Sequence, residues 1–468
     1  MAGPGSSELA AGGACLLIAF AARFAFREPQ AFWWLTVAFA PLAVPFQTGV
    51  AGLEITVPLE PMLAVSGVAL LFVRPAPARG WPQLLRHPVV LAAATSVAWM
   101  AVASAAAPVP IAGAKATAAR ALYAGVLLGG GIAFLRTERD IRRLVLVSAA
   151  ALVVPSVRAL AVLASAGFER AAAFESARPF FANRLDLVAV TTVWGVAGVG
   201  LLAGRGRGGL SAGRSLALKA FSALGLAVLV ALYARSAIAG AGAALLALPL
   251  LSGRVRPRAA VASLLAGLGA AALAVTLLAS ARAARSVAEP PPGPFSPAAD
   301  GILALPPLRD VSILERLNRW NAGLRMAAER PVTGFGPNGF ERAYGPYQNA
   351  FETTRDSSYA GLRGDAHSEL LSALVEQGVP GLVFLLALLA TPVAAAVRAA
   401  RASDAPETRA IAAALGAALA AFAAMNVFNS FLDLDKVAPA FWLLAAGSVA
   451  LDPEGLSAAP APTSPEGC

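Results

Sequence analysis

The chain has few charged residues, only two cysteines and only two histidines. Of its 468 residues, 14% are charged, whereas an ordinary soluble domain carries about 25%. Cys15 lies in the first apolar run and Cys468 is the last residue, so the cysteines indicate neither a disulfide framework nor a metal-ligand spacing. No cleavable signal peptide is expected, because the first apolar run lacks a basic leader and the chain stays hydrophobic throughout.

Apolar residues are abundant instead. They make up 58% of the chain, and the mean hydropathy is +0.68. Apolar runs of about 20 residues, the length of a helix that crosses a bilayer, recur along the sequence. We therefore predict an all-α polytopic integral membrane protein with roughly 12–13 transmembrane helices. The candidate runs are 9–26, 30–47, 55–73, 88–107, 117–135, 143–164, 184–203, 216–234, 237–252, 259–281, 369–397, 408–428 and 436–451. Twelve spans are equally compatible with the sequence, because Arg23, Arg27 and Pro29 interrupt the first two runs, and only Arg235-Ser236 separates the two runs within 216–252.

The net charge of +10 could indicate nucleic acid or an anionic membrane surface as a partner. The positions of the arginines favour the membrane. They concentrate in alternate short connectors, at Arg136, Arg139, Arg142 and Arg143, at Arg205, Arg207 and Arg214, at Arg254, Arg256 and Arg258, and at Arg398, Arg401 and Arg409. The long loop 282–366 is nearly neutral, with ten arginines against nine acids. This pattern places the short connectors in the cytoplasm and the long loop outside, and implies no nucleic acid.

Four regions follow from this arrangement. Residues 1–281 are expected to form an N-terminal transmembrane bundle, and residues 282–366 a periplasmic loop that opens with a Pro-rich turn at Glu289–Pro297. Residues 367–451 are expected to form the C-terminal transmembrane helices, and residues 452–468 a disordered tail.

Within the long loop, apolar side chains recur at helical spacing and predict a helix over about 311–329 that ends before Pro331. The stripe consists of Ile313, Leu317, Trp320 and Leu324. Such a stripe usually packs, either on the bundle or at the lipid interface. Arg316 and Arg319 lie three residues apart on one face and could bind a pyrophosphate, although two such arginines are usually a solvated face.

His367 is the principal candidate for chemistry. It stands where the loop meets an apolar run, and its ring can change charge near neutral pH, so it could act as a general base or orient a substrate. Alternatively it is a structural residue that caps the next helix. Asp365 and Glu369 flank it, and either could orient the imidazole. The other histidine, His87, lies in a basic connector and is expected to be a solvated flank.

Further arginines lie on the outer side. Arg235 separates two apolar segments and is either an interfacial arginine that reaches the headgroups or a phosphate clamp. Arg178 and Arg184 surround another outer connector and allow the same two interpretations. The string from Gly334 to Gly339 fits G-x-G-x-x-G, but a helix precedes it rather than a strand. We interpret it as a tight turn and not as a dinucleotide site.

Taken together, these residues resemble a known pattern. His367-Ser368, nine residues, and then Gly378-x-x-Gly381 are similar to the H-[NSQ]-x9-G-x-x-G motif of the O-antigen ligase/polymerase superfamily of bacterial membrane glycosyltransferases. Arg316-x-x-x-Trp320, followed by Pro331, Gly334-x-Gly336 and Phe340, resembles the preceding loop segment of that family.

Two bundle segments resemble the family with departures. Arg235-Ser236-Ala237 is similar to its Ser-Arg-Gly element, with the order around the arginine altered. The segment Phe180–Val190 is similar to its Asn-Pro-Asn segment, with Arg184 in place of the proline.

The resemblance implies a GT-C-like fold in the bacterial inner membrane, with the active site at the periplasmic face. It implies an undecaprenyl-pyrophosphate-linked glycan donor, an acceptor such as lipid A-core, contact with membrane lipid, and no cofactor or metal. His367 would serve as base or positioning group, and Arg316 and Arg235 would bind the pyrophosphate in a single inverting displacement. Arg319, Arg184, Arg178 and Trp320 are further substrate-binding candidates.

Several functions remain compatible with the sequence. Within the superfamily the chain could be a ligase, a polymerase that joins repeat units, or a protein O-oligosaccharyltransferase; the spacing of the histidine motif favours the ligase. Outside it, a transporter of a lipid-linked anion would also explain arginines near the membrane. Transporters more often show internal repeats with binding residues near the bilayer midplane, whereas this histidine lies at the edge.

Overall fold

The computed structural model describes residues 19–47, 54–75, 80–203, 210–232, 234–251, 311–349, 353 and 364–453. Several expected features lie outside these residues: both cysteines, the start of the first span, the span at 259–281, the Pro-rich turn Glu289–Pro297, the connector arginines at 205, 207, 254, 256 and 258, and the tail from 454.

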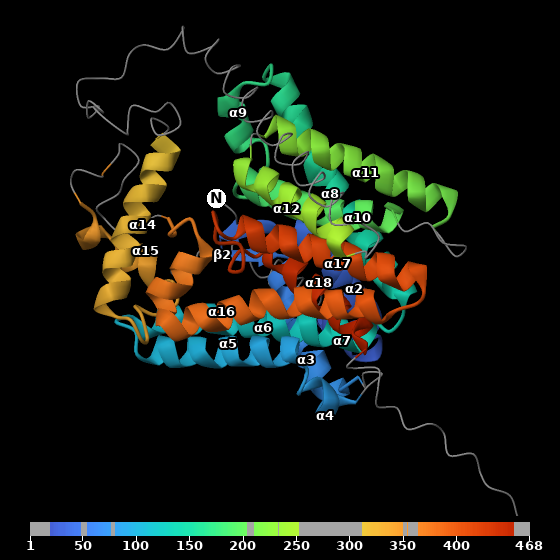
Figure 1. The fold of residues 1–468 in the computed structure, drawn as a ribbon, viewed down its shortest axis with the longest axis horizontal. Helices are drawn as coiled ribbons and strands as arrows, with labels where there is room; N and C mark the ends of the chain where they lie inside the picture. Colours follow the sequence, from blue (N-terminus) through green and yellow to red (C-terminus); the bar gives the residue numbers. More distant parts are fainter. Residues whose placement is uncertain are drawn as a thin grey trace, which may run out of the picture.

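The described chain is almost entirely helical (Figure 1). A helical segment at residues 19–27 precedes the labelled helices. These are α2 (Pro29–Phe39), α3 (Leu59–Val73), α4 (Trp81–Leu84), α5 (Pro88–Ala105), α6 (Pro110–Tyr123), α7 (Gly130–Phe134), α8 (Glu138–Ser165), α9 (Arg170–Glu175), α10 (Arg184–Ala203), α11 (Ala212–Ala231), α12 (Arg235–Leu251), α14 (Val311–Glu329), α15 (Gly339–Ala343), α16 (Glu369–Ala402), α17 (Pro406–Met425) and α18 (Ala438–Leu451). A π-helical turn, Ala124–Gly129, joins α6 to α7 without a break.

Among the residues that the structure describes, seven helical segments are long and apolar enough to cross a membrane. They are Pro88–Ala105, Pro110–Phe134, Glu138–Ser165, Arg184–Leu202, Ala212–Ala231, Glu369–Ala402 and Pro406–Met425. Three shorter apolar helices accompany them, at Leu59–Val73, Arg235–Leu248 and Ala438–Leu451. The prediction of an all-α multi-pass membrane protein is therefore confirmed. Large apolar side chains such as Leu216, Leu226 and Val230 on α11 are exposed, as expected of a lipid-facing surface.

One expected helix ends early. The sequence predicts a single span over residues 30–47, but the helix stops at a short 3-10 turn, Ala40–Leu42, and Val44–Gln47 forms strand β1. It pairs antiparallel with β2 (Glu54–Val57). Pro41 and Pro45 explain this difference, because neither can donate the backbone hydrogen bond that a continuing helix needs.

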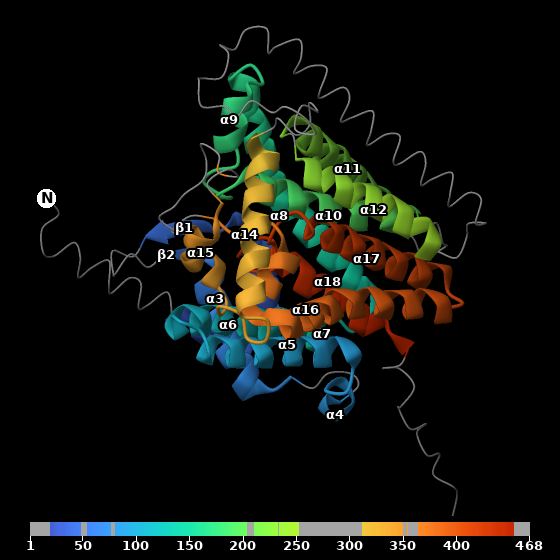
Figure 2. The ribbon, with the colours of Figure 1, turned by 60° about the vertical axis from the view of Figure 1, so that its left-hand side comes forward.

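Helix α17 lies at the centre of the bundle, between α10, α12, α16 and α18 (Figures 1 and 2). Its sequence is rich in alanine and most of it is buried. Small residues let the helices approach closely: a Cβ on Gly240 of α12 would lie 2.5 Å from Cγ of Met425. Helix α5 runs beside α16, and α14 packs against α16 (Figure 2). The bundle thus holds α16, whose first residue follows the His367 segment, in a fixed place.

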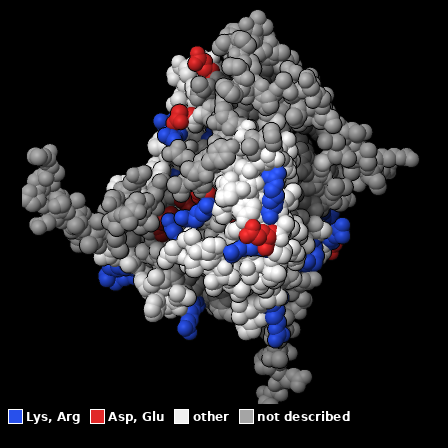
Figure 3. All heavy atoms as spheres, turned by 90° about the vertical axis from the view of Figure 1, so that its left-hand side faces the viewer, with Lys and Arg blue, Asp and Glu red and all other residues white. Residues whose placement is uncertain are grey.

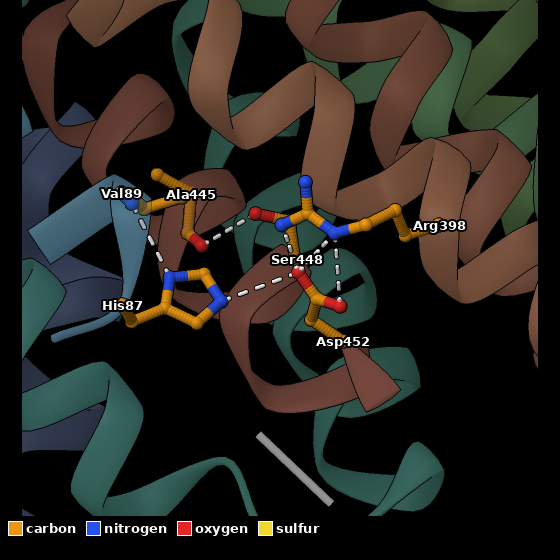
Figure 4. A network of polar contacts seen from close by, with 6 residues as sticks. All are labelled: His87, Val89, Arg398, Ala445, Ser448 and Asp452. Carbon is orange, nitrogen blue, oxygen red and sulfur yellow. Dashed lines mark hydrogen bonds and ion pairs between the residues drawn. The ribbon is translucent and has the colours of Figure 1, made fainter. Parts of the chain in front are cut away.

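The expectation that His87 is a solvated flank is wrong. The ring is buried, and its Nδ1 accepts from the backbone N–H of Val89 at 3.2 Å, which caps α5. Its Nε2 lies 3.2 Å from Oδ2 of Asp452, to which Nε of Arg398 also donates at 3.2 Å (Figure 4). This contact joins the start of α5 to the ends of α16 and α18, a link between distant segments that the local sequence does not reveal.

Candidate functional site

Helix α14 forms where the periodicity predicts it, and the leucines of the predicted stripe lie outside its buried face. Leu317 and Leu324 are exposed. The buried face carries instead Glu315, Asn318, Arg319, Ala322 and Met326. Small residues on this face allow close packing, since a Cβ on Gly323 would meet Leu371 of α16 at 3.0 Å. The exposed leucines fit the lipid-interface alternative, while the polar face turns toward the His367 segment.

Two consecutive side chains of α14 hold the backbone that leads to His367. Nη1 of Arg319 donates to the carbonyl of Asp365 at 2.8 Å, and Nε1 of Trp320 donates to the carbonyl of Ala366 at 3.0 Å. Arg319 is itself fixed by an ion pair of 2.8 Å with Glu315 one turn earlier. Three candidates from the sequence, Arg319, Trp320 and His367, therefore lie close together. Arg319 and Trp320 hold the backbone of the two residues that precede His367.

His367 is oriented by Asp365 and not by Glu369. Its Nδ1 lies 2.9 Å from Oδ1 of Asp365, and its backbone N–H donates to the same oxygen at 3.0 Å. This geometry assigns the ring proton to Nδ1 and leaves Nε2 as an acceptor. The side chains are 37% and 41% exposed, so a substrate can reach them.

The Asp365 carboxylate is stabilised by its partners. Partial burial raises the pKa of Asp365, but the hydrogen bonds from His367 and Ser430, together with the charge of His367, lower that pKa by more. The net direction is downward, so Asp365 is ionised and available to orient the imidazole at neutral pH.

The glycine motifs on either side of the site dock onto each other. Helix α16 is broken at Gly378, whose φ is 70°. The turn at 331–336 lies against this break: Pro331 accepts from Val379 N–H at 2.8 Å, and Phe335 and Gly336 donate to the carbonyls of Val375 and Glu376 at 3.0 and 2.8 Å. The interpretation of G-x-G as a tight turn is confirmed, since Gly334 and Gly336 have φ of 65° and 84°. The distance in sequence between His367 and Gly378 thus places the break in α16 where the turn 331–336 binds it.

The other predicted arginines lie on several elements. Arg316 is on α14, three residues before Arg319, and Arg235 is the exposed first residue of α12. Arg184 begins α10 and is 8% exposed, with its guanidinium 4.0 Å from the centre of the Phe174 ring. Arg178 is exposed and pairs with Glu175 at 3.1 Å. Among these candidates, Arg319 and Trp320 lie directly against the His367 segment.

An arginine that the sequence analysis missed lies behind the site. Arg120 of α6 is 3% exposed, and its Nη2 donates to Oε1 of Glu369 at 3.2 Å and to Oδ1 of Asp433. The other oxygen of Glu369 accepts from the backbone N–H of Leu432 at 3.3 Å. The sequence could have indicated this residue, because Arg120 falls inside the predicted span 117–135. An ionisable residue within a transmembrane helix suggests a functional site.

The turn between α17 and α18 brings further charged groups to this end of the bundle. The Lys436 ammonium donates to the carbonyls of Ala43 and Phe180, which lie far apart in the sequence. Burial lowers the pKa of Lys436 to about 8, while the charges of Asp435 and Asp186 act in the opposite direction. Figure 3 shows acidic and basic side chains side by side on the face at the left of Figure 1.

The same turn is tied to the β-ribbon and to α6. Asp435 accepts from the Thr56 hydroxyl at 2.7 Å and from the Tyr123 hydroxyl at 3.2 Å. Residues from the ribbon, α6, the Phe180 segment and the turn therefore converge where α16 begins.

Comparison with known proteins supports the resemblance. Residues 220–386 match the family model described as O-antigen ligase, a segment that includes α14, His367 and the Gly378-x-x-Gly381 pair. No curated protein matches the chain. This match over residues 220–386, together with the helical membrane fold, supports the predicted resemblance to the O-antigen ligase superfamily.

Proposed function

We propose that the chain is a ligase-type glycosyltransferase. It moves a glycan from undecaprenyl pyrophosphate to a hydroxyl of lipid A-core, or of a similar acceptor, at the periplasmic face of the bacterial inner membrane. The observation that carries the proposal is the accessible His367–Asp365 pair, with its 2.9 Å contact, inside the segment that matches the O-antigen ligase model.

In the proposed reaction, Nε2 of His367 accepts the proton of the acceptor hydroxyl. The hydroxyl oxygen attacks the anomeric carbon while the bond from that carbon to the pyrophosphate oxygen breaks. Undecaprenyl pyrophosphate leaves with the bonding electron pair, and a single displacement inverts the anomeric configuration. Asp365 stabilises the imidazolium that forms on His367.

The arginines act on the leaving group in this proposal. Arg316 and Arg235 bind the pyrophosphate and stabilise the negative charge that grows on it, because a guanidinium fork suits paired anionic oxygens. Arg184 and Arg178 are further contacts for the anionic donor. Arg319 and Trp320 serve the reaction by holding the His367 backbone. The polyprenyl tail lies along the apolar helix faces, where its burial supplies affinity.

The test is glycan transfer in a strain deleted for this gene and complemented with wild type, His367→Ala, Arg316→Ala or the control Arg342→Ala. Arg342 is exposed on the short helix α15 and should rescue fully. Surface polysaccharide and lipid-linked intermediates are followed on gels, with protein levels checked.

Each outcome distinguishes one function. Long glycans that accumulate on the lipid carrier, with none on lipid A-core and no rescue by His367→Ala or Arg316→Ala, support the ligase. Accumulation of single repeat units assigns the chain to the polymerases. Full rescue by both variants would overturn the catalytic assignment and favour transport.

A further inference from the structure

The buried ion cluster around Arg120 carries an inference about how His367 is held. Arg120 is 3% exposed within a membrane-spanning helix, where an unpaired guanidinium would be costly. Its Nη2 contacts two carboxylates, those of Glu369 and Asp433. The Asp433 side chain is 38% exposed, so Glu369 is the carboxylate that is buried together with Arg120.

Glu369 connects this cluster directly to the site. It is the first residue of α16 and stands two residues after His367. Its carboxylate is used at both oxygens, by Arg120 and by Leu432 N–H, and its backbone N–H donates to the carbonyls of Asn426 and Asn429 at 3.0 Å each. Two residues span at most about 7 Å of chain, so a shift of Glu369 is transmitted to His367.

The backbone of His367 needs such support. Its φ of 49° lies in the left-handed region, which is unfavourable for a residue with a side chain. Such conformations persist only where the surroundings over-determine them. Arg319 and Trp320 hold residues 365 and 366 on one side, and the Arg120 cluster holds residue 369 on the other.

We propose that Arg120 is a positioning residue for glycan transfer, acting through Glu369 to keep the His367 imidazole aimed at the acceptor hydroxyl. This inference rests on the proposed function. In this role Arg120 acts on the reaction without touching the substrate. It differs in this from the arginines that are proposed to bind the pyrophosphate.

The test compares variants that separate charge, geometry and folding. Arg120→Lys keeps the charge but cannot reach both carboxylates with the same geometry. Arg120→Met leaves Glu369 buried without its cation and is expected to lower stability as well as activity. The double variant Arg120→Met/Glu369→Gln removes both buried charges, a replacement that is often neutral for stability.

A matched control lies at the other end of the bundle. Arg142 of α8 also bridges two carboxylates, with its Nη2 2.9 Å from Glu138 and 2.6 Å from Glu407. Arg142→Met removes a comparable cluster far from His367. It is expected to lower thermal stability and to leave kcat per folded molecule unchanged.

The assay uses protein purified in detergent, with lipid-linked glycan and lipid A-core both extracted from the strain deleted for this gene. The amount of folded protein is measured by thermal unfolding. A misplacement of about 1 Å costs on the order of 100-fold in rate, so the double variant is expected to lose about 100-fold in kcat with KM for the acceptor within about threefold of wild type. Arg120→Lys is expected to lose about tenfold.

The outcomes separate this inference from the proposed function. If wild type transfers no glycan from this donor, the proposed function fails and the inference falls with it. If wild type transfers glycan while Arg120→Lys and the double variant retain its kcat, only the positioning role of Arg120 is overturned. The positioning role would also be overturned if the Arg120 variants lost activity only in proportion to their loss of folded protein, as is expected for Arg142→Met.

Discussion

At the scale of single residues, the orientation of His367 depends on one carboxylate oxygen. Oδ1 of Asp365 accepts both from the His367 backbone N–H and from Nδ1 of its ring. The two contacts link the backbone conformation to the ring tautomer, because neither can move without straining the other. The carbonyls of Asp365 and Ala366 are in turn held by α14. The imidazole is therefore oriented in the absence of substrate, as the proposed proton transfer requires.

We expect Asp365→Asn to lower the transfer rate by about 100-fold or more. The amide has nearly the same shape, but its NH2 group can face Nδ1 and favour the ring tautomer in which Nε2 carries the proton and cannot act as a base. Initial rates with purified protein measure the effect. Asp404→Asn, an exposed carboxylate between α16 and α17, is the matched control. If Asp365→Asn kept a transfer rate within threefold of wild type, Asp365 would have no role in orienting the base.

Residue-level prediction from the sequence succeeded where the partners are close along the chain. Asp365 and Glu369 could both be proposed as partners of His367 because they lie two residues away. The choice between them could not be predicted, since it depends on Arg120, which is 249 residues from Glu369 and attracts it to the opposite side. Asp452, 365 residues from His87, escaped prediction for the same reason. Long-range ion pairs have no periodic signature.

At the scale of elements, the break in α16 organises the outer loop. Carbonyls freed by the kink at Gly378 would lack partners inside a membrane protein, where each unsatisfied backbone group costs several kcal/mol. The turn 331–336 supplies the donors, and Nε1 of Trp99 on α5 donates to the Gln377 carbonyl at 2.8 Å. The loop is thereby fixed to the same helix that carries His367 at its start.

Gly378→Ala should destabilise the protein by several kcal/mol. At φ of 70° the new Cβ costs about 1–2 kcal/mol, and it would overlap the Val332 carbonyl, which is backbone and cannot move aside. Thermal unfolding in detergent measures the loss, and transfer activity should fall with it.

Gly195→Ala is the control for this change. Gly195 lies in the middle of α10, and the position that an alanine Cβ would take there has nothing within 4 Å. Alanine at this position should stabilise the helix by about 0.5–1 kcal/mol. Equal stability of the two variants would show that the docking at Gly378 contributes little.

Most elements could be predicted because hydropathy and periodicity report on helices directly. The break between α11 and α12 at Arg235 and the helix over 311–329 both lie where the sequence indicates them. The β-ribbon was missed because its strands continue apolar runs that read as helix, and only the prolines at 41 and 45 mark the change. The buried face of α14 was missed because it is formed by small and ion-paired residues rather than by leucines.

At the scale of the whole molecule, α16 connects two polar clusters. The His367 site stands at its first residue and Arg398, with His87 and Asp452, near its last. The part of α16 that follows its break at Gly378, residues 379–402, is about 36 Å long, longer than the hydrocarbon core of about 30 Å. The clusters therefore lie on opposite sides of any membrane that α16 crosses. The connector that carries Arg142 lies at the Arg398 end, because Arg142 pairs with Glu407 at the start of α17. By the positive-inside rule we expect this end to face the cytoplasm and His367 to face the periplasm.

This orientation predicts which surfaces a membrane-impermeant maleimide can reach. In a background where Cys15 and Cys468 are replaced by alanine, Ala328→Cys at the exposed end of α14 should be labelled on intact spheroplasts. Ala402→Cys, exposed at the last residue of α16, should be labelled only after lysis. The cysteine-free parent measures background, and complementation by each variant shows that its fold is intact. Labelling in the reverse order would place His367 in the cytoplasm, away from a lipid-linked donor on the outer leaflet, and the proposed ligase reaction could not occur there.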